Sequence, residues 1–268
     1  MSERSYSIIG RWSADAETPA MIGARFLDTL EQLTPLAPVT RNWLFADPLT
    51  AKPIPIADAA PEIVTLIRRG VGRDDDGADG RQGYSLFARG GEVESQFGTP
   101  RSVDVGARAG SKWDNQVGFE IGGLRYPFDP ELVTYPVYRG AFDILGTVWP
   151  CPWLEAYLFA PNYPPQPPGY TLSDNKPVRP PRTEMVFPWI LYLSAPLAAG
   201  CPIPTELIRE RTPGGGVVLS ATRDRLDRDN PDHIRRSRML QSIIADRIDS
   251  RRGPGSSSLG LQARGGPF

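Results

Sequence analysis

Two periodicities of apolar side chains divide the chain into expected helices and strands. Apolar residues recur at helical spacing after Thr18-Pro19 and predict a helix from Pro19 to about Leu33 with one buried stripe. Thr18 is a suitable N-cap, and proline suits the first helical position because it has no N–H to satisfy there. Further helices are expected over 61–69, 137–149 and 231–248.

Alternation of apolar and polar residues predicts strands in other segments. The clearest case is 116–122, where Val117, Phe119 and Ile121 would point to one face. Four such segments separated by glycine-bearing turns indicate an antiparallel meander, with strands over 84–88, 92–97, 102–107 and 116–122. Other strands are expected over 4–10, 42–47, 155–160 and 187–194, and a hairpin is expected over 205–222.

Helices and antiparallel strands are mixed without a regular strand–helix–strand alternation, which favours an α+β fold with an antiparallel sheet and packed helices. The 268 residues are 40% hydrophobic and 23% charged, which is typical of a globular chain with an ample core. We expect a single globular domain over 1–250. The Gly/Ser/Pro-rich tail over 251–268 is expected to be disordered.

The composition also bears on where the chain acts. The most apolar window, 187–204, contains four prolines and is therefore expected to be buried core and not a membrane span. The first twenty residues lack the apolar stretch of a signal peptide. The expectation is a soluble cytoplasmic protein that does not bind a membrane.

The charge pattern argues against nucleic acid as a partner. The formal net charge is -1, and basic residues alternate with Asp and Glu along the chain. Six Trp and nine Tyr could stack on single-stranded nucleic acid, but such platforms combine aromatic residues with a basic groove. Packing in the core is the better explanation for these aromatic residues.

Few residues are suited to nucleophilic chemistry. His233 is the only histidine, and near the start of the last expected helix a solvated side chain is the favoured interpretation. Cys151 lies within Trp-Pro-Cys-Pro-Trp, a pattern typical of a packed corner with a buried thiol. Whether Cys151 and Cys201 form a disulfide stays open.

Three local motifs resemble ligand-binding sequences only in part. The glycines of 213–218 lack the Lys-Ser/Thr of a phosphate-binding loop, and a hairpin turn explains them better. The Asp-rich stretch 74–80 fails the calcium-loop register, and 174–176 has the end of a nuclease-type motif but lies among prolines. No cofactor, metal site or catalytic residue is expected. This inventory favours a binding protein over an enzyme.

The aromatic and glycine positions point to a known family. Residues 5–248 resemble the bacterial immunity protein 52 family in a first strand with Gly10 and Trp12, an acidic turn with Glu17 and an amphipathic helix. The later features are Trp43, a helix ending in Trp149, Trp189 within "WILYLS", "PGGGVVLSAT", and a last helix after "NPDH". The proline-rich stretch 161–183 departs from this pattern and is interpreted as an insertion.

The resemblance implies an antitoxin without catalysis of its own. Such proteins silence a cognate toxin delivered between competing bacteria, often by type VI secretion, and the linked toxins carry a restriction-endonuclease-like nuclease domain. A nuclease site is basic because it holds phosphates, so carboxylates can occupy it. The densest acidic run is therefore the toxin-binding candidate: Asp74, Asp75, Asp76 and Asp79.

Several alternatives stay open beside this hypothesis. The acidic run is also explained as a solvated loop, and binding away from the toxin's active site is equally compatible. Gly10, Trp12, Trp43 and Trp189 are expected to be structural. A hydrolytic enzyme using carboxylates and His233 would need a deep pocket in which acids converge. An adaptor subunit of a secretion system would bind several apparatus proteins. The oligomeric state is open.

Overall fold

A computed structural model describes ten stretches of the chain. They are residues 5–13, 17–36, 38–71, 83–91, 99, 101–111, 115–122, 128–162, 183–212 and 214–247. The strand expected over 92–97, most of the insertion over 161–183, and the tail over 251–268 lie outside these residues.

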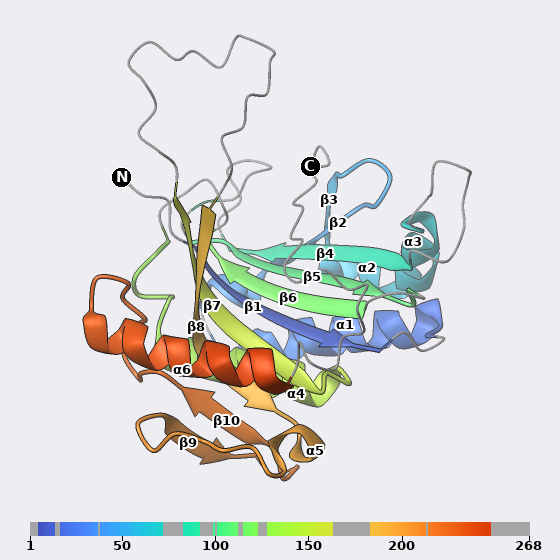
Figure 1. The fold of residues 1–268 in the computed structure, drawn as a ribbon. Helices are drawn as coiled ribbons and strands as arrows, with labels where there is room; N and C mark the ends of the chain where they lie inside the picture. Colours follow the sequence, from blue (N-terminus) through green and yellow to red (C-terminus); the bar gives the residue numbers. More distant parts are fainter. Residues whose placement is uncertain are drawn as a thin grey trace.

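A ten-stranded antiparallel sheet forms the centre of the described fold (Figure 1). The strands are β1 (Ser5–Trp12), β2 (Trp43–Ala46), β3 (Pro53–Pro55), β4 (Tyr84–Gly90), β5 (Val103–Ala109), β6 (Asn115–Ile121), β7 (Trp153–Asn162), β8 (Thr183–Leu193), β9 (Ile208–Arg211) and β10 (Val217–Ser220). Their order is β3-β2-β4-β5-β6-β1-β7-β8-β10-β9. The first strand in sequence therefore lies in the middle of the sheet.

Helices cover the two faces of this sheet unequally. They are α1 (Pro19–Leu33), α2 (Ile56–Ala59), α3 (Ile63–Arg69), α4 (Tyr135–Val148), α5 (Ala195–Ala198) and α6 (Pro231–Arg247). Helices α1 and α4 pack against each other and against β5, β1 and β7 on one face. Helix α6 packs on β8, where Leu191 and Leu193 are buried on the other face (Figure 1). The expected α+β fold with an antiparallel sheet is confirmed.

Most of the predicted elements are present, with shifted ends. Helix α1 has the predicted bounds, and the Met21 backbone N–H donates to Thr18 Oγ1 at 3.3 Å. Helix α4 begins two residues earlier than predicted, because proline is compatible with its first turn. The hairpin of β9 and β10 is confirmed.

The segment 48–61 carries four prolines, a pattern typical of a surface loop, but only part of it is irregular. It contains strand β3 and helix α2. Proline cannot donate a backbone hydrogen bond, but β3 is an edge strand, where prolines are tolerated.

An aromatic cluster joins four distant parts of the chain. Tyr6 of β1, Tyr138 of α4 and Trp189 of β8 have ring centroids 5.1–6.4 Å apart. The Tyr138 hydroxyl donates to the Tyr6 carbonyl at 2.6 Å, and the Tyr6 hydroxyl donates to the Leu226 carbonyl at 2.7 Å. Because each of these buried hydroxyl groups has a hydrogen-bond acceptor, the cluster buries its rings without leaving a polar group unpaired.

The tryptophans of the family resemblance lie in the core. Trp12 packs on Trp149 with ring centroids 5.2 Å apart, and the Trp12 Nε1–H donates to Glu17 at 3.3 Å. Glu17 also pairs with Arg25 of α1. Trp43 and Trp189 are buried as well. The acidic turn after β1 therefore satisfies a buried indole, and the structural role expected for these tryptophans is confirmed.

Gly10 is required by packing, and we predict that Gly10→Ala destabilises the fold. An added Cβ would lie 2.6 Å from Leu154 Cδ2 and 2.7 Å from Cys151 Sγ. Overpacking of this kind costs about 1–3 kcal/mol in the free energy of unfolding. Urea denaturation of the variant measures this cost.

The matched control is Gly118→Ala, whose Cβ would meet only the Ile8 carbonyl oxygen, at 3.6 Å. This variant should unfold at the same or a slightly higher urea concentration than the wild type. Equal stability of the Gly10 and Gly118 variants would contradict the packing account.

Candidate functional site

One side of strands β4, β5, β6 and β1 keeps its side chains in contact with solvent. Along each strand, core residues that face α1 and α4 alternate with residues that are half-buried or exposed. We call the second set the open face. It consists of Ser85, Phe87, Arg89, Asp104, Gly106, Arg108, Gln116, Gly118, Glu120, Ser7, Ile9 and Arg11.

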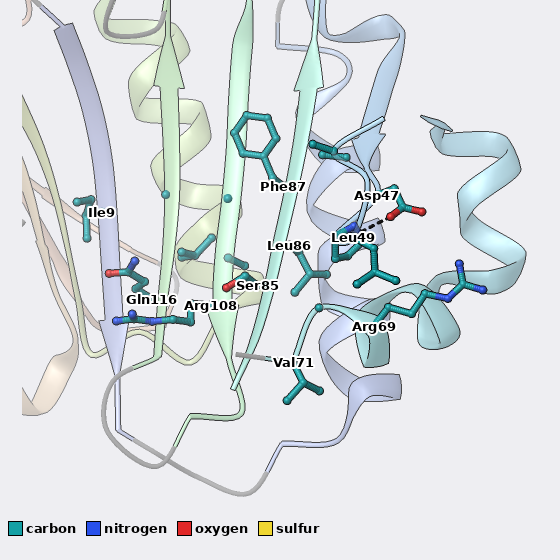
Figure 2. A pocket seen from close by; sticks show the side chains of 18 residues that line it. Ile9, Asp47, Leu49, Arg69, Val71, Ser85, Leu86, Phe87, Arg108 and Gln116 are labelled. Atoms are coloured by element: carbon teal, nitrogen blue, oxygen red, sulfur yellow. Dashed lines mark hydrogen bonds between the residues drawn. The ribbon is translucent and has the colours of Figure 1, made fainter. Parts of the chain in front are cut away.

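A hollow of about 800 Å³ lies over the open face (Figure 2). Its floor is the sheet, and its outer wall is made by residues 47–51, after β2, and 69–71, at the end of α3. Figure 2 shows strand side chains on one side and wall side chains on the other: Ile9, Gln116 and Arg108 against Asp47, Leu49 and Arg69.

Two glycines keep the floor of this hollow free of side chains. Gly106 and Gly118 are register partners on β5 and β6. A Cβ on Gly106 would have no atom closer than 3.8 Å, and one on Gly118 none closer than 3.6 Å. Neither residue has a positive φ angle. Neither packing nor backbone conformation therefore requires glycine at these two positions.

The wall turn presents an apolar side chain. Asp47 Oδ1 accepts the backbone N–H groups of Leu49 at 2.8 Å and Thr50 at 3.0 Å. The hydrogen bond from Thr50 is the main cause of the lowered pKa of Asp47. Ala51 completes the turn with a φ of 54°. Leu49, 63% exposed, is thus held at the edge of the hollow.

Two carboxylates lie side by side beyond the floor of the hollow. Asp104 and Glu120 are register partners, and Arg89 holds Asp104 with two hydrogen bonds of 2.6 and 2.7 Å. Glu120 Oε1 is shielded from solvent and has no hydrogen-bond partner among the described residues. Burial, together with the charge of Asp104, raises the pKa of Glu120 to about 7. Burial also raises the pKa of Asp104, against the effect of Arg89.

The residues singled out from the sequence are not brought together by the described fold. Asp74, Asp75, Asp76 and Asp79 lie outside the described residues. The solvated interpretation of His233 was wrong in part, because His233 is half-buried and its Nδ1 accepts the Asp227 backbone N–H at 3.1 Å. It holds the loop that precedes α6.

The cysteines and the glycine-rich turn are structural features. Cys151 and Cys201 are free thiols, so the open question of a disulfide is answered. Cys151 is buried as expected, and burial raises the pKa of its thiol. The Thr212 N–H donates to the Gly216 carbonyl at 3.0 Å, which confirms the hairpin turn.

Sequence reasoning found three of the four meander strands, β4, β5 and β6, but missed their open face. The strand expected over 92–97 does not lie between its neighbours as predicted, because β4 pairs directly with β5. The available signal was the composition of the outward positions of 103–109 and 115–121. These positions combine charged or amide side chains with one glycine in each strand. Glycine is disfavoured inside strands, so a glycine pair at outward positions indicates a site of close approach.

The described part of the chain has neither a metal-binding cluster nor a membrane-spanning helix. No group of three or more His, Cys, Asp or Glu residues there is arranged to hold a metal ion. Within the same residues, no helix has the length and apolar character needed to cross a membrane.

Comparison with known proteins gives a distant structural likeness. No protein-family model matches the chain, and no curated protein matches it. Among solved structures, the chain is similar to a T6SS protein of Pseudomonas aeruginosa, with 15% sequence identity and a TM-score of 0.49. The match covers 90% of this chain and 73% of that protein.

Glu120 makes the stability of the fold depend on pH. Its pKa is about 7 in the folded protein, against an ordinary value of 4.5 for a glutamate in an unfolded chain. Between these two pH values the folded state retains a proton that the unfolded state loses. Stability from this group is therefore present below pH 4.5 and is lost as the pH rises through 7.

We predict that Glu120→Gln removes this loss. Relative to the wild type, the variant should gain roughly 3 kcal/mol in the free energy of unfolding between pH 4 and pH 8. Urea denaturation of both proteins at both pH values measures the difference. The contributions of other titrating groups are nearly the same in the two proteins and largely cancel. A difference between the two proteins that does not change with pH would contradict the shifted pKa.

Proposed function

We propose that this chain is an immunity protein, an antitoxin that binds a cognate protein toxin and has no catalytic activity of its own. The observation that carries the proposal is the open face, a broad sheet surface with charged side chains and the apolar Phe87, bordered by the exposed Leu49 of the wall turn. Surfaces that mix apolar anchors with arginine are typical of protein recognition.

The family resemblance supports a toxin as the partner. Its characteristic residues, such as Gly10, Trp12 and Trp189, occupy core positions of this fold. The resemblance therefore rests on scaffold positions, and none of the residues named for it lies on the open face. An immunity protein can use such a scaffold to present a separate surface to its toxin. The proposed partner class is a secreted nuclease, delivered by a type VI secretion system.

The acidic run is compatible with an interface beside the open face. The segment that carries Asp74, Asp75, Asp76 and Asp79 connects Val71 to Gly83, and Val71 pairs with Tyr84 in an isolated bridge. Val71 also lines the hollow. One end of the acidic segment thus lies at the hollow, and the bridge keeps the other end beside it. We propose that the acidic run adds a second contact to the same partner.

The absence of catalysis is part of the proposal and is supported by what the reactive side chains do. His233 accepts a backbone hydrogen bond, and the raised pKa of Cys151 keeps its thiol protonated. Within the described residues, the pair of Asp104 and Glu120 favours the alternative of a carboxylate-dependent hydrolase. The pKa of Glu120 is near 7, and an acid with such a pKa suits proton transfer. Neither residue lines the hollow, however.

Co-expression tests the proposed function. The product of the adjacent upstream gene is expressed in a bacterial host with and without this chain, and the complex is purified through a tag on this chain. We expect toxicity that this chain relieves, together with stoichiometric co-purification. A toxic neighbour that neither binds this chain nor is relieved by it would contradict the proposal for that pair.

A titration separates binding from catalysis. An antitoxin that occludes its target should inhibit the purified toxin up to a one-to-one ratio, with a sharp end point. A hydrolase that inactivates the toxin would act below that ratio and would continue with time. Complete inhibition at a tenth of the toxin concentration would therefore overturn the non-catalytic assignment and favour the carboxylate alternative.

A further inference from the structure

No contact within the described part of the chain explains why glycine, and not a larger residue, forms the floor of the hollow. Glycine inside a strand is destabilising by about 0.5–1 kcal/mol relative to alanine. Gly106 and Gly118 both have room for a Cβ, and they lie directly opposite each other on neighbouring strands. Two adjacent unfavourable residues that no described contact requires are explained if another backbone approaches the sheet at this point.

The charged groups around this floor leave positive charge available. Arg69 and Arg108 line the hollow from opposite sides, and both are exposed. Arg108 makes no ion pair with another described residue. Arg69 makes no direct ion pair with one either, but its charge contributes to the lowered pKa of Asp47 in the same wall. Asp47 also accepts two backbone N–H groups within its own turn, so it balances the charge of Arg69 only in part. A ligand in the hollow would therefore meet Arg108 without a described carboxylate partner and Arg69 with only a distant one, which favours a ligand with carboxylates.

The shape and the apolar lining favour a protein segment over a small molecule. Leu49 and Phe87 offer apolar contact at the rim, and Leu49 is 63% exposed. Pockets for small ligands enclose most of the ligand surface. This hollow instead lies on the face of a sheet with exposed side chains around it, which suits a chain segment lying flat across the strands.

We propose that the hollow over Gly106 and Gly118 is the docking groove for an extended, carboxylate-bearing segment of the toxin. The main chain of that segment lies on the glycine floor, an apolar side chain contacts Leu49 and Phe87, and its carboxylates pair with Arg69 and Arg108. This inference rests on the proposed function, since it names the surface that the toxin occupies.

Filling the groove gives the sharpest test. Gly118→Val adds a side chain that suits a strand and projects into the hollow, and the surrounding space admits its Cβ. The variant should be at least as stable as the wild type by thermal denaturation. It should nevertheless bind the catalytically inactivated product of the adjacent gene at least tenfold more weakly, as measured by calorimetry.

Charge reversal tests the predicted chemistry of the partner. Arg108→Glu should weaken the same binding on the order of tenfold to a hundredfold and reduce its dependence on salt. The matched control is Arg209→Glu on β9, an exposed residue of the strand at the far end of the sheet. It changes the net charge by the same amount and should alter the affinity less than twofold.

The outcomes separate the groove from the function. If the wild type binds and both groove variants bind equally well, the groove proposal is overturned and the immunity function stands. If Arg108→Glu and Arg209→Glu weaken binding equally, net charge and not this groove is responsible, and the proposal fails. If the wild type does not bind the adjacent product at all, the proposed function fails for that pair and the groove proposal fails with it.

Discussion

The contact of Tyr138 with Tyr6 and Trp189 decides which face of the sheet becomes core. These three side chains hold α4 against β1 and β8, and the two tyrosine hydroxyl groups bond to main-chain carbonyls at 2.6 and 2.7 Å. Strand side chains alternate between faces, so placing Tyr6 inward turns Ser7, Ile9 and Arg11 to the other side. Because β6, β5 and β4 pair in register from β1 outward, the same alternation fixes which of their side chains face the core.

The position of the open face therefore follows from how the core is packed. Its composition, however, has features that core packing does not explain. The open face has a glycine pair at its centre and beside it Arg108, which pairs with no described carboxylate, and the turn at Asp47 holds Leu49 outward at the edge of the hollow. Each of these features leaves stabilisation unrealised in the free protein, and together they are compatible with a partner that supplies it.

Local signals predicted local structure well. The Thr18 cap and the Pro19 start gave the bounds of α1, and the alternation of Val117, Phe119 and Ile121 identified β6. The sheet order could not be predicted, because β1 pairs with β6 and β7, which follow more than a hundred residues later. The groove depends on this long-range register, which places Gly106 opposite Gly118. The acidic candidates Asp74, Asp75, Asp76 and Asp79 were visible from composition alone, and the described residues leave them untested.

Hydroxyl-radical footprinting of the chain alone and with its toxin tests the central claim most directly, because it reports which face the partner covers. Phe87 reports on the open face, Leu49 on the edge of the hollow over it, and Met21 of α1, 46% exposed, on the helical layer. Our account predicts that binding lowers the oxidation of Phe87 and Leu49 several-fold and leaves Met21 unchanged. Protection of Met21 with unchanged Phe87 and Leu49 would place the toxin on the helical face and contradict the account.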